Sequence, residues 1–204
     1  MIKVCILDYG SGNVKSVLNL FSSITKNIVV SNNPTEIQKA THIILPGVGA
    51  FSAAMRKIHE RLPIDILEEV VLGNKRPFLG ICVGMQVLAT RGMEFGECRG
   101  LGWIDGIVEK IETQHLPLPH IGWNNISQKR ESPLLDGLRT DSDFYFVHSY
   151  ALRLEENQQI LATTNYEEEF CSILQQDNIY GVQFHPEKSQ QAGINLAKNF
   201  LSLI

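Results

Sequence analysis

The segment Gly80-Ile81-Cys82-Val83-Gly84 has the spacing of a nucleophile elbow, with cysteine in place of serine. Glycines at both ends allow a sharp turn from a strand into a helix, which would expose the Cys82 sulfur at the carboxyl edge of a sheet. The free amides of the helix's first turn would face the sulfur and favour the thiolate, and the Val83 amide could point at an oxyanion. The segment indicates a cysteine nucleophile. The alternative is an inert cysteine packed between two glycines.

His185 is the histidine best placed to serve as the base that a cysteine nucleophile needs. It ends an apolar, strand-like run and stands in His185-Pro186-Glu187. Pro186 biases the residue before it toward extended backbone, in which residues i and i+2 point to the same side. Glu187 could then accept a hydrogen bond from one ring nitrogen while the other nitrogen faces a thiol. The motif alone is short enough to occur by chance, but beside the cysteine elbow it predicts a Cys-His-Glu triad.

The composition is that of a soluble globular protein. The chain has 204 residues, of which 44% are hydrophobic and 20% charged, and its formal net charge is -4. These values exclude a disordered chain, a collagen-like repeat and a disulfide-stapled miniprotein. They also argue against binding nucleic acid mainly through phosphate contacts. The length, together with the lack of a linker or repeat, predicts a single domain over residues 1–204.

The cysteines indicate a reducing environment. The four cysteines are Cys5, Cys82, Cys98 and Cys171, and no two of them form a Cys-x-x-Cys pair. The chain opens directly into an apolar strand pattern rather than a signal peptide, and no apolar stretch reaches the roughly 20 residues of a membrane span. We therefore expect a cytoplasmic protein without disulfides. There is no metal-ligand spacing, Walker loop or dinucleotide fingerprint, so we expect no metal and no cofactor.

Strand-like apolar runs alternate with helical patterns through the first half of the chain. The runs cover residues 3–8, 27–30, 42–45 and 77–81, and helical patterns cover 14–24, a short segment from Pro34, 50–73 with a break at Pro63, and 85–89. This alternation predicts an α/β fold with a mostly parallel sheet and helices on both faces.

The second half has shorter strand-like stretches separated by turns. They cover residues 103–112, 119–126, 143–150, 160–165, 170–175 and 179–184, and a helix with one apolar face covers 189–204. We expect this half to be more antiparallel than the first. Cys82 and His185 each follow a strand, so both should lie at an edge of the sheet.

Three motifs in this order resemble the class I glutamine amidotransferases: Leu45-Pro46-Gly47-Val48-Gly49, residues 80–86, and His185-Pro186-Glu187. The resemblance implies that family's fold, a central mostly parallel sheet flanked by helices, with additional antiparallel strands in the second half. It implies that Cys82 attacks the side-chain amide of glutamine and forms a glutamyl thioester, which is then hydrolysed. His185 would protonate the departing ammonia and then activate water, and Glu187 would orient His185.

The resemblance also implies an oxyanion site and a glutamine pocket. The amides of Val48 and Val83 would face the developing negative charge, and the glycines beside Val48 would allow its peptide to flip. A plain strand-ending turn is the alternative for that loop. Glu94 would suit the ammonium group of the substrate. The full set of implied substrate-binding residues is Gly49, Gln86, Glu94, His148, Ser149 and Tyr150.

Three further segments, at residues 8–13, 119–124 and 146–150, resemble one branch of the family. Members of that branch pass ammonia to a separate (β/α)₈-barrel cyclase subunit, which closes an imidazole ring in histidine biosynthesis and releases a purine precursor. The resemblance implies a heterodimer with that cyclase. Aromatic side chains are common interface anchors. The residues implied at the interface are Asn13, Pro119, Trp123, Asn124, Tyr145 and Lys188.

Residues 89–96 depart from the acidic or bulky run that the branch leads us to expect there, although Glu94 is present. A similar amidotransferase that supplies ammonia to surface-polysaccharide sugar amidation is therefore an alternative, and it would use the same triad. A non-catalytic scaffold on the same fold would tolerate loss of Cys82 or His185, but both are present. A cysteine-peptidase-like thiol hydrolase would have no need of Gln86 or the Pro-Gly-Val-Gly loop.

Overall fold

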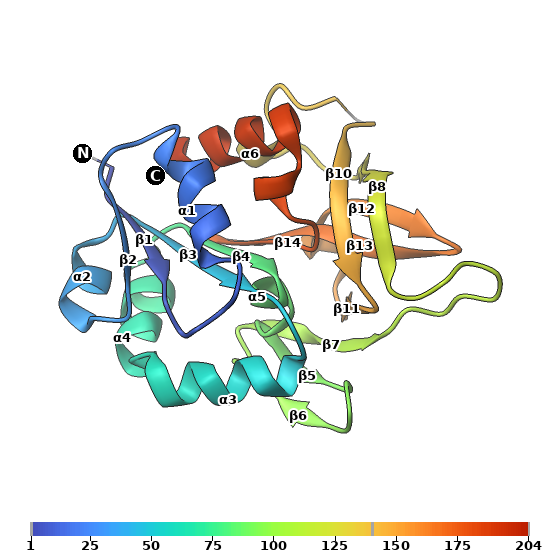
Figure 1. The fold of residues 1–204 in the computed structure, drawn as a ribbon, viewed down its shortest axis with the longest axis horizontal. Coiled ribbons are helices and arrows are strands. Elements are labelled where there is room, and N and C mark those ends of the chain that lie inside the picture. Colours follow the sequence, from blue (N-terminus) through green and yellow to red (C-terminus); the bar gives the residue numbers. More distant parts are fainter. Residues whose placement is uncertain (1, 140, 204) are drawn as a thin grey trace.

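The structure, a computed structural model, describes residues 2–139 and 141–203, and within these ranges an eight-stranded mixed sheet forms the centre of the molecule (Figure 1). In spatial order its strands are β2 (Ile28–Ser31), β1 (Val4–Leu7), β3 (His42–Gly47), β4 (Phe78–Cys82), β14 (Ile179–Val182), β13 (Glu168–Gln176), β12 (Ile160–Tyr166) and β9 (Ser127–Gln128). The strands from β2 to β14 pair in parallel, and those from β14 to β9 pair antiparallel. The predicted division into a parallel first half and a more antiparallel second half is confirmed.

Helices cover both faces of this sheet. Figure 1 shows α1 and α6 on one face and α3 and α4 on the other. The helical elements are α1 (Val14–Ser22), α2 (Pro34–Lys39), α3 (Phe51–Arg61), α4 (Ile64–Glu68), the π-helical turn η1 (Glu69–Gly73), α5 (Val83–Gln86), the 3₁₀ turns η2 (Pro133–Leu135), η3 (Asn157–Gln159) and η4 (Pro186–Lys188), and α6 (Gln190–Ser202). Every helix among the described residues is too short or too polar to cross a membrane.

Two smaller sheets lie beside the central one. β8 (His120–Asn125) and β10 (Asp143–His148) form an antiparallel ribbon, and β11 (Tyr150–Leu154), β7 (Ile104–Lys110), β5 (Ala89–Gly92) and β6 (Cys98–Arg99) form a four-stranded sheet in that order. The predicted single strand over residues 143–150 is therefore wrong. The chain leaves the ribbon after His148 and enters a different sheet at Tyr150, because β11 pairs with β7.

The helical pattern predicted for residues 85–89 is also wrong, since α5 ends at Gln86 and β5 begins at Ala89. The carbonyl of Val87 accepts a hydrogen bond from the Leu101 amide, and that of Leu88 accepts from Trp103. These contacts with a distant segment stop the helix after one turn. Val87, Leu88 and Ala89 are fully buried, and an apolar run buried on all sides does not distinguish helix from strand.

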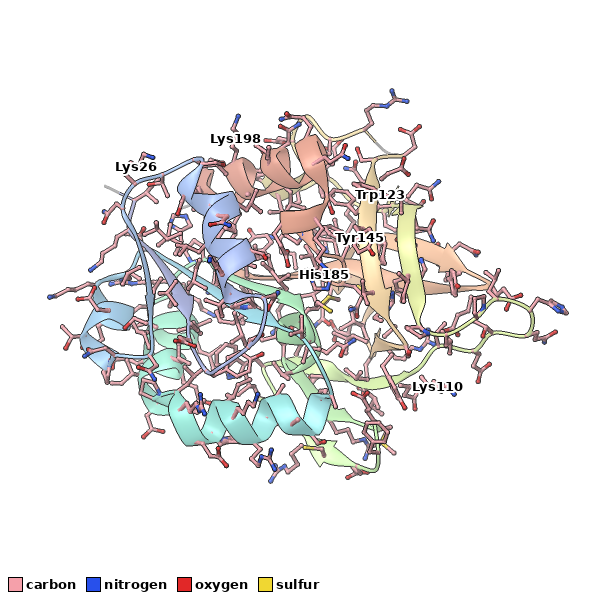
Figure 2. All side chains as sticks on the ribbon, in the orientation of Figure 1. Lys26, Lys110, Trp123, Tyr145, His185 and Lys198 are labelled. Carbon is pink, nitrogen blue, oxygen red and sulfur yellow. The ribbon has the colours of Figure 1, made fainter. Side chains whose placement is uncertain are left out.

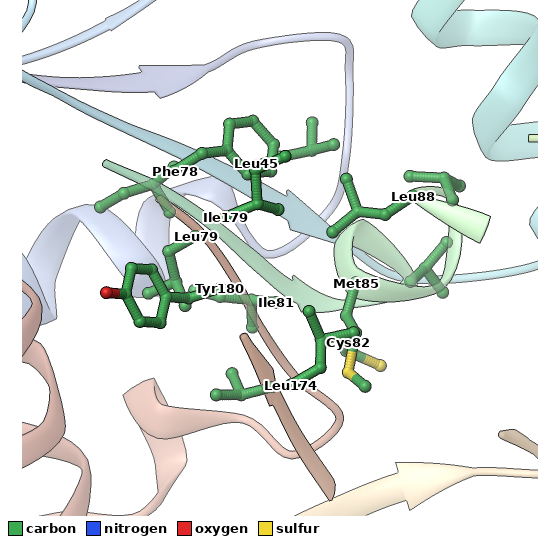
Figure 3. Close-up of a cluster of buried hydrophobic side chains, with 14 of the residues drawn as sticks. Leu45, Phe78, Leu79, Ile81, Cys82, Met85, Leu88, Leu174, Ile179 and Tyr180 are labelled. Carbon is green, nitrogen blue, oxygen red and sulfur yellow. The ribbon is translucent and has the colours of Figure 1, made fainter. Parts of the chain in front are cut away.

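Strand β4 runs through the middle of the core and leads to Cys82. All of its residues are buried, and Figure 3 shows its side chains Leu79 and Ile81 packed among the buried side chains of neighbouring elements. β4 lies between β3 and β14, so three parallel strands end side by side at one edge. The ends of these strands and the loops that follow them contain residues 47–49, Cys82 and His185. Ligand sites of open α/β sheets commonly lie at such an edge.

Glycines allow α5 to lie directly against the strands beside it. A Cβ added at Gly84 would lie 1.9 Å from the Leu45 carbonyl oxygen, and one added at Gly80 would lie 2.5 Å from the Gly84 carbonyl oxygen. Both obstacles are backbone atoms. The glycines on either side of Cys82 are therefore required by packing between backbones, in addition to the turn predicted from the sequence.

Gly84→Ala should destabilise the fold, because neither backbone can move away without shifting β3 or α5. We expect the free energy of unfolding to fall by about 1–3 kcal/mol or more, measured by urea denaturation. Gly73→Ala is the matched control, since nothing lies within 4 Å of a Cβ added there. The control should change stability by no more than about 0.5 kcal/mol. Equal stability of the Gly84→Ala variant and the parent would contradict the close approach.

Candidate functional site

Cys82 occupies a sharp turn between β4 and α5. Its backbone has φ 54° and ψ -113°, a conformation that residues with a side chain rarely adopt. Such strain persists only where the surrounding structure enforces it, and it is concentrated at functional sites. The predicted elbow is present, although α5 is a single turn of four residues. The helix that follows the sulfur is therefore one turn, shorter than the helix expected.

His185 follows β14 and is held by its backbone as well as by its ring. Its amide donates a hydrogen bond to the Tyr145 carbonyl at 2.8 Å, and its own carbonyl accepts one from the Ser189 hydroxyl at 2.6 Å. The ring is buried, and in Figure 2 it lies between the central sheet and the strand that carries Tyr145. Ser189 also accepts a hydrogen bond from the Tyr145 amide at 3.0 Å, so strand β10 fixes His185 from both ends.

Glu187 and Cys82 lie beside the ring of His185. His185 Nδ1 lies 2.9 Å from Glu187 Oε1 and the Glu187 side chain is fully buried, while Cys82 borders the same cavity as His185. The three predicted triad residues are therefore brought together. The extended geometry expected for the motif is only partly correct: His185 is extended, but residues 186–188 form the 3₁₀ turn η4. The carboxylate reaches Nδ1 across that turn.

The environment of His185 favours its charged form. Burial alone would lower the pKa of the ring, but the hydrogen bonds to Cys82 and Glu187 and the negative charges of both groups raise it to about 10. The ring is therefore an imidazolium at neutral pH, with a carboxylate on one side and the sulfur on the other. This arrangement provides a proton beside the predicted nucleophile, Cys82.

Asn13 lies against the triad carboxylate. Its side chain is buried, its Nδ2 donates to Glu187 Oε1 at 3.2 Å, and its Oδ1 accepts a hydrogen bond from Ser11 at 2.8 Å. From the sequence, Asn13 was expected at a partner interface, and this contact was not anticipated. Asn13 comes from the loop after β1, whose strand pairs with β3 at the same edge of the sheet. The amide thus helps to orient the carboxylate that orients His185.

A cavity of about 280 Å³ opens beside Cys82 and His185. All of the residues expected at the oxyanion site and the substrate pocket line it. The complete lining is Asn13, Val48, Gly49, Cys82, Val83, Gln86, Glu94, Pro119, Val147, His148, Ser149, Tyr150, His185 and Lys188. Val147 was not predicted from the sequence, and its carbonyl lies 3.9 Å from the Cys82 sulfur.

Gln86 has a fixed orientation in the wall of the cavity. Its Nε2 donates to the Tyr150 carbonyl and to Gln183 Oε1, each at 2.9 Å. Both amide hydrogens are used, so the oxygen is the atom left to accept a hydrogen bond from a bound molecule. Gln183 in turn donates to the Cys82 sulfur at 3.8 Å. Gln183 was not predicted from the sequence, where the only local signal is a polar residue in an otherwise apolar run.

Glu94 links the cavity to the first turn of α3. Its Oε2 accepts a hydrogen bond from the Phe51 amide at 2.8 Å, so it satisfies a backbone donor at the start of that helix. The carboxylate also lines the cavity. The structure therefore places Glu94 near Cys82, and its expected role toward a substrate ammonium stays a prediction.

Apart from the buried Asn13, the expected interface residues form a surface next to the cavity. Trp123 is 49% exposed, and its ring meets that of Tyr145 edge to face at 6.0 Å between centroids. Lys188 Nζ lies 5.5 Å from the centre of the Tyr145 ring. Ile121, which was not predicted, is 59% exposed and lies on the same side of β8 as Trp123, two residues away. Pro119 is exposed and Asn124 is half-buried.

The other three cysteines lie outside this cavity, and all four described cysteines are free thiols. Cys5 and Cys171 are buried, and burial raises the pKa of each thiol to about 12. Cys98 is partly exposed and lies on β6. The prediction that Cys82 alone has a catalytic context agrees with these positions.

Residues 5–203 match the family described as glutamine amidotransferase class-I. The chain is 45% identical to the imidazole glycerol phosphate synthase subunit HisH 2 of Methanococcus maripaludis over 199 residues, which cover 97% of this chain and 98% of that protein. It is 43% identical to subunit HisH 1 of Campylobacter jejuni over 201 residues, which cover 98% of this chain and 100% of that protein. These matches confirm the family resemblance predicted from the sequence motifs.

Solved structures confirm the predicted fold class. The fold is similar to that of a putative GMP synthase component from Thermoplasma acidophilum, with a TM-score of 0.73 and 18% identity, covering 98% of this chain and 92% of that one. It is also similar to a structure described as a glutamine amidotransferase, with a TM-score of 0.75 and 17% identity, covering 97% and 96% of the two chains. At these identities the likeness concerns the fold alone.

We predict that Glu187→Gln lowers the pKa of His185, because the substitution removes a negative charge that raises it and replaces a charge-assisted hydrogen bond with a weaker neutral one. The measurement is a pH titration of the imidazole ring by NMR, with Glu97→Gln as the control because Glu97 is exposed and pairs with Arg91. The folded-state pKa of about 10 lies above the ordinary value of 6.5. Protonation of His185 therefore stabilises the fold fully below about pH 6.5, and this stabilisation disappears as the pH rises toward 10. A ring that titrates near pH 6.5 in both parent and variant would contradict the prediction.

Proposed function

The chain belongs to the class I glutamine amidotransferase family, and on that premise we propose that it hydrolyses L-glutamine to glutamate and ammonia with Cys82, His185 and Glu187 as its catalytic groups. The observation that carries the proposal is the buried His185 ring, which pairs with the buried Glu187 carboxylate at 2.9 Å and borders the same cavity as the elbow sulfur. This cavity lies at the carboxyl edge of the central sheet. Nucleophile, acid and orienting group are assembled side by side before any substrate arrives.

The first half of the reaction uses the proton that His185 already holds. The Cys82 sulfur attacks the side-chain amide carbon of glutamine, and the carbonyl electrons move onto the oxygen. As the tetrahedral intermediate collapses, the carbon–nitrogen bond breaks and His185 gives its proton to the departing nitrogen, so ammonia leaves. A glutamyl thioester remains on Cys82. Glu187 stabilises the imidazolium that precedes this transfer.

The second half of the reaction regenerates the sulfur. His185, now neutral, takes a proton from a water molecule, and the resulting hydroxide attacks the thioester carbon. The carbon–sulfur bond breaks, glutamate leaves, and Cys82 and His185 return to the thiolate–imidazolium pair. Asn13 and Glu187 keep the ring in one orientation through both halves.

The oxyanion would be bound by backbone amides from two strand ends. Val83 begins α5 immediately after the sulfur, and Val48 stands in the loop after β3. Gly49 has φ 95°, which favours glycine and gives this loop backbone freedom. We propose that the amides of Val83 and Val48 share the charge once the loop is aligned.

The proposed partner is a (β/α)₈-barrel cyclase subunit that forms a heterodimer with this chain in the cytoplasm. The relatives are named as subunits of imidazole glycerol phosphate synthase, and they match this chain over nearly its whole length. Ammonia would leave the cavity past Pro119 and Lys188, beside the exposed Trp123 and the half-buried Tyr145. The cyclase would use it to make imidazole glycerol phosphate, with release of a purine precursor, in histidine biosynthesis.

Cys82→Ala should abolish glutamine hydrolysis while leaving the fold intact, because it removes the nucleophile and a buried sulfur of small volume. We expect the rate to fall by at least roughly 10³-fold, measured as glutamate production by the complex with the cyclase. Cys98→Ala is the matched control because Cys98 lies outside the cavity, and it should keep the parent rate. Glutamate production by Cys82→Ala near the parent rate would refute the nucleophile assignment.

Complementation of a histidine auxotroph lacking this subunit tests the acceptor pathway. Expression of the chain with its matching cyclase should restore growth without histidine, and Cys82→Ala should not. The sugar-amidation alternative shares the triad but not the acceptor. An active glutaminase that fails to rescue growth would therefore overturn the histidine assignment and leave the glutaminase assignment standing.

A further inference from the structure

A continuous line of hydrogen bonds connects strand β8 to the Cys82 sulfur through buried side chains. The four side chains inside the line are buried. In order, its contacts are Asn124 Nδ2 to His120 Nε2 (3.3 Å), His120 Nδ1 to His148 Nε2 (3.0 Å), His148 Nδ1 to the Tyr150 carbonyl (2.9 Å), Gln86 Nε2 to the same carbonyl (2.9 Å) and to Gln183 Oε1 (2.9 Å), and Gln183 Nε2 to Cys82 Sγ (3.8 Å).

The partners at the two ends of the histidine pair determine where each proton lies. The Tyr150 carbonyl can only accept, so His148 carries its proton on Nδ1 and its Nε2 is a bare acceptor. His120 must then donate from Nδ1 to that acceptor, which leaves its own Nε2 bare. This nitrogen faces the Asn124 amide, which donates. The Asn124 oxygen accepts a hydrogen bond from the Asn125 amide at 2.9 Å, which sets the orientation of the amide group.

Both rings are held neutral by their surroundings. Burial lowers the pKa of His120 to about 4 and that of His148 to about 3. A second proton on His148 would place two donors, one on each ring, 3.0 Å apart. A second proton on His120 would face a donor of the Asn124 amide. The line of hydrogen bonds therefore exists in one protonation state and one tautomer of each ring.

The packing of His120 is separate from its hydrogen bonds. Its ring stacks on Tyr166 at 4.0 Å and on Phe146 at 4.9 Å between centroids. A phenyl ring would preserve this stacking but could not donate to His148. An asparagine would lose the stacking but would keep a donor near the position of Nδ1. Packing and proton donation can therefore be removed one at a time.

We propose that His120 is a positioning residue: by donating to His148 it fixes the Tyr150 carbonyl, and through Gln86 and Gln183 it orients the hydrogen bond that the Cys82 sulfur accepts. The consequence for catalysis rests on the glutaminase function proposed above. Loss of the His120 donor would free the His148 ring to turn or change tautomer. The Tyr150 carbonyl would then lose one of its two donors, and Gln86 would lose a fixed acceptor.

The tautomers can be measured without any enzyme assay. In ¹⁵N NMR spectra of the histidine rings at pH 7, His120 and His148 should each show a protonated Nδ1 and a bare Nε2. In His120→Phe, His148 should lose this pure Nδ1–H state. A protonated Nε2 on either ring of the parent protein would overturn the proposal, as would an unchanged His148 signal in the variant.

His120→Phe and His120→Asn should rank in one order by activity and in the opposite order by stability. His120→Phe should lower kcat for glutamine by roughly tenfold, because one buried acceptor loses its donor, and it should slow iodoacetamide alkylation of Cys82 severalfold. His120→Asn should stay within about threefold of the parent in both assays but unfold at a lower denaturant concentration than His120→Phe. His59→Phe, at an exposed histidine on α3, is the matched control and should leave both rates unchanged.

A purely structural role predicts the reverse order, in which activity follows stability and His120→Asn is the weaker enzyme. That result would overturn the proposal. The tautomer and alkylation measurements use no glutamine. If both measurements give the expected results but neither the parent protein nor any variant hydrolyses glutamine, the glutaminase function fails and the hydrogen-bond line stands. If glutamine hydrolysis is normal in His120→Phe, the positioning role fails and the glutaminase function stands.

Discussion

The backbone strain at Cys82 is the constraint on which the site depends. A residue with a side chain holds φ 54° and ψ -113° there only because backbone packs against backbone on both sides of it. A Cβ at Gly47 would lie 2.6 Å from the Gly84 amide nitrogen, and one at Gly84 would lie 1.9 Å from the Leu45 carbonyl oxygen. The loop after β3 and the turn after β4 are thus locked together. The same contacts that keep the sulfur exposed to the cavity also set the distance to the proposed oxyanion loop.

The parallel sheet explains why widely separated motifs could be assigned to one site from the sequence. Strands β3, β4 and β14 end at the same edge, so the loops that follow them must converge. Local patterns of glycine, proline and apolar residues were sufficient to place Cys82 and His185 at strand ends. They were not sufficient for α5, because the hydrogen bonds that end this helix come from Leu101 and Trp103, on a distant segment. Tertiary pairing overrode a helical pattern there.

The contacts that the sequence could not predict are those between polar residues that are distant in the chain and have apolar neighbours. Gln183 looks like a chance polar residue in a strand, yet its amide bonds to Gln86 and Cys82. His120 and His148 lie 28 positions apart and become a pair only when β8 and β10 align them. The hydrophobic pattern and the turns set the register of two strands, but they do not mark which polar residues will face each other.

Three buried histidines show how strongly neighbouring groups determine the pKa of an imidazole ring. His185 has a carboxylate and a sulfur beside it, and its pKa rises to about 10. His120 and His148 have a neutral nitrogen, an amide or a carbonyl as partners, and burial lowers their pKa values to about 4 and about 3. His148 belongs to β10, His120 pairs with it from β8, and the His185 amide bonds to Tyr145 on β10, so one strand holds a charged ring and a neutral pair in one buried region.

Tyr145 on strand β10 makes contacts in two different regions of the molecule. Tyr145 turns its ring outward to Trp123 and Lys188, while its carbonyl receives the amide of His185. A substitution on the outer surface of β10 therefore acts on the same peptide unit that holds the backbone of His185. The outer surface and the site are mechanically coupled through the Tyr145 peptide.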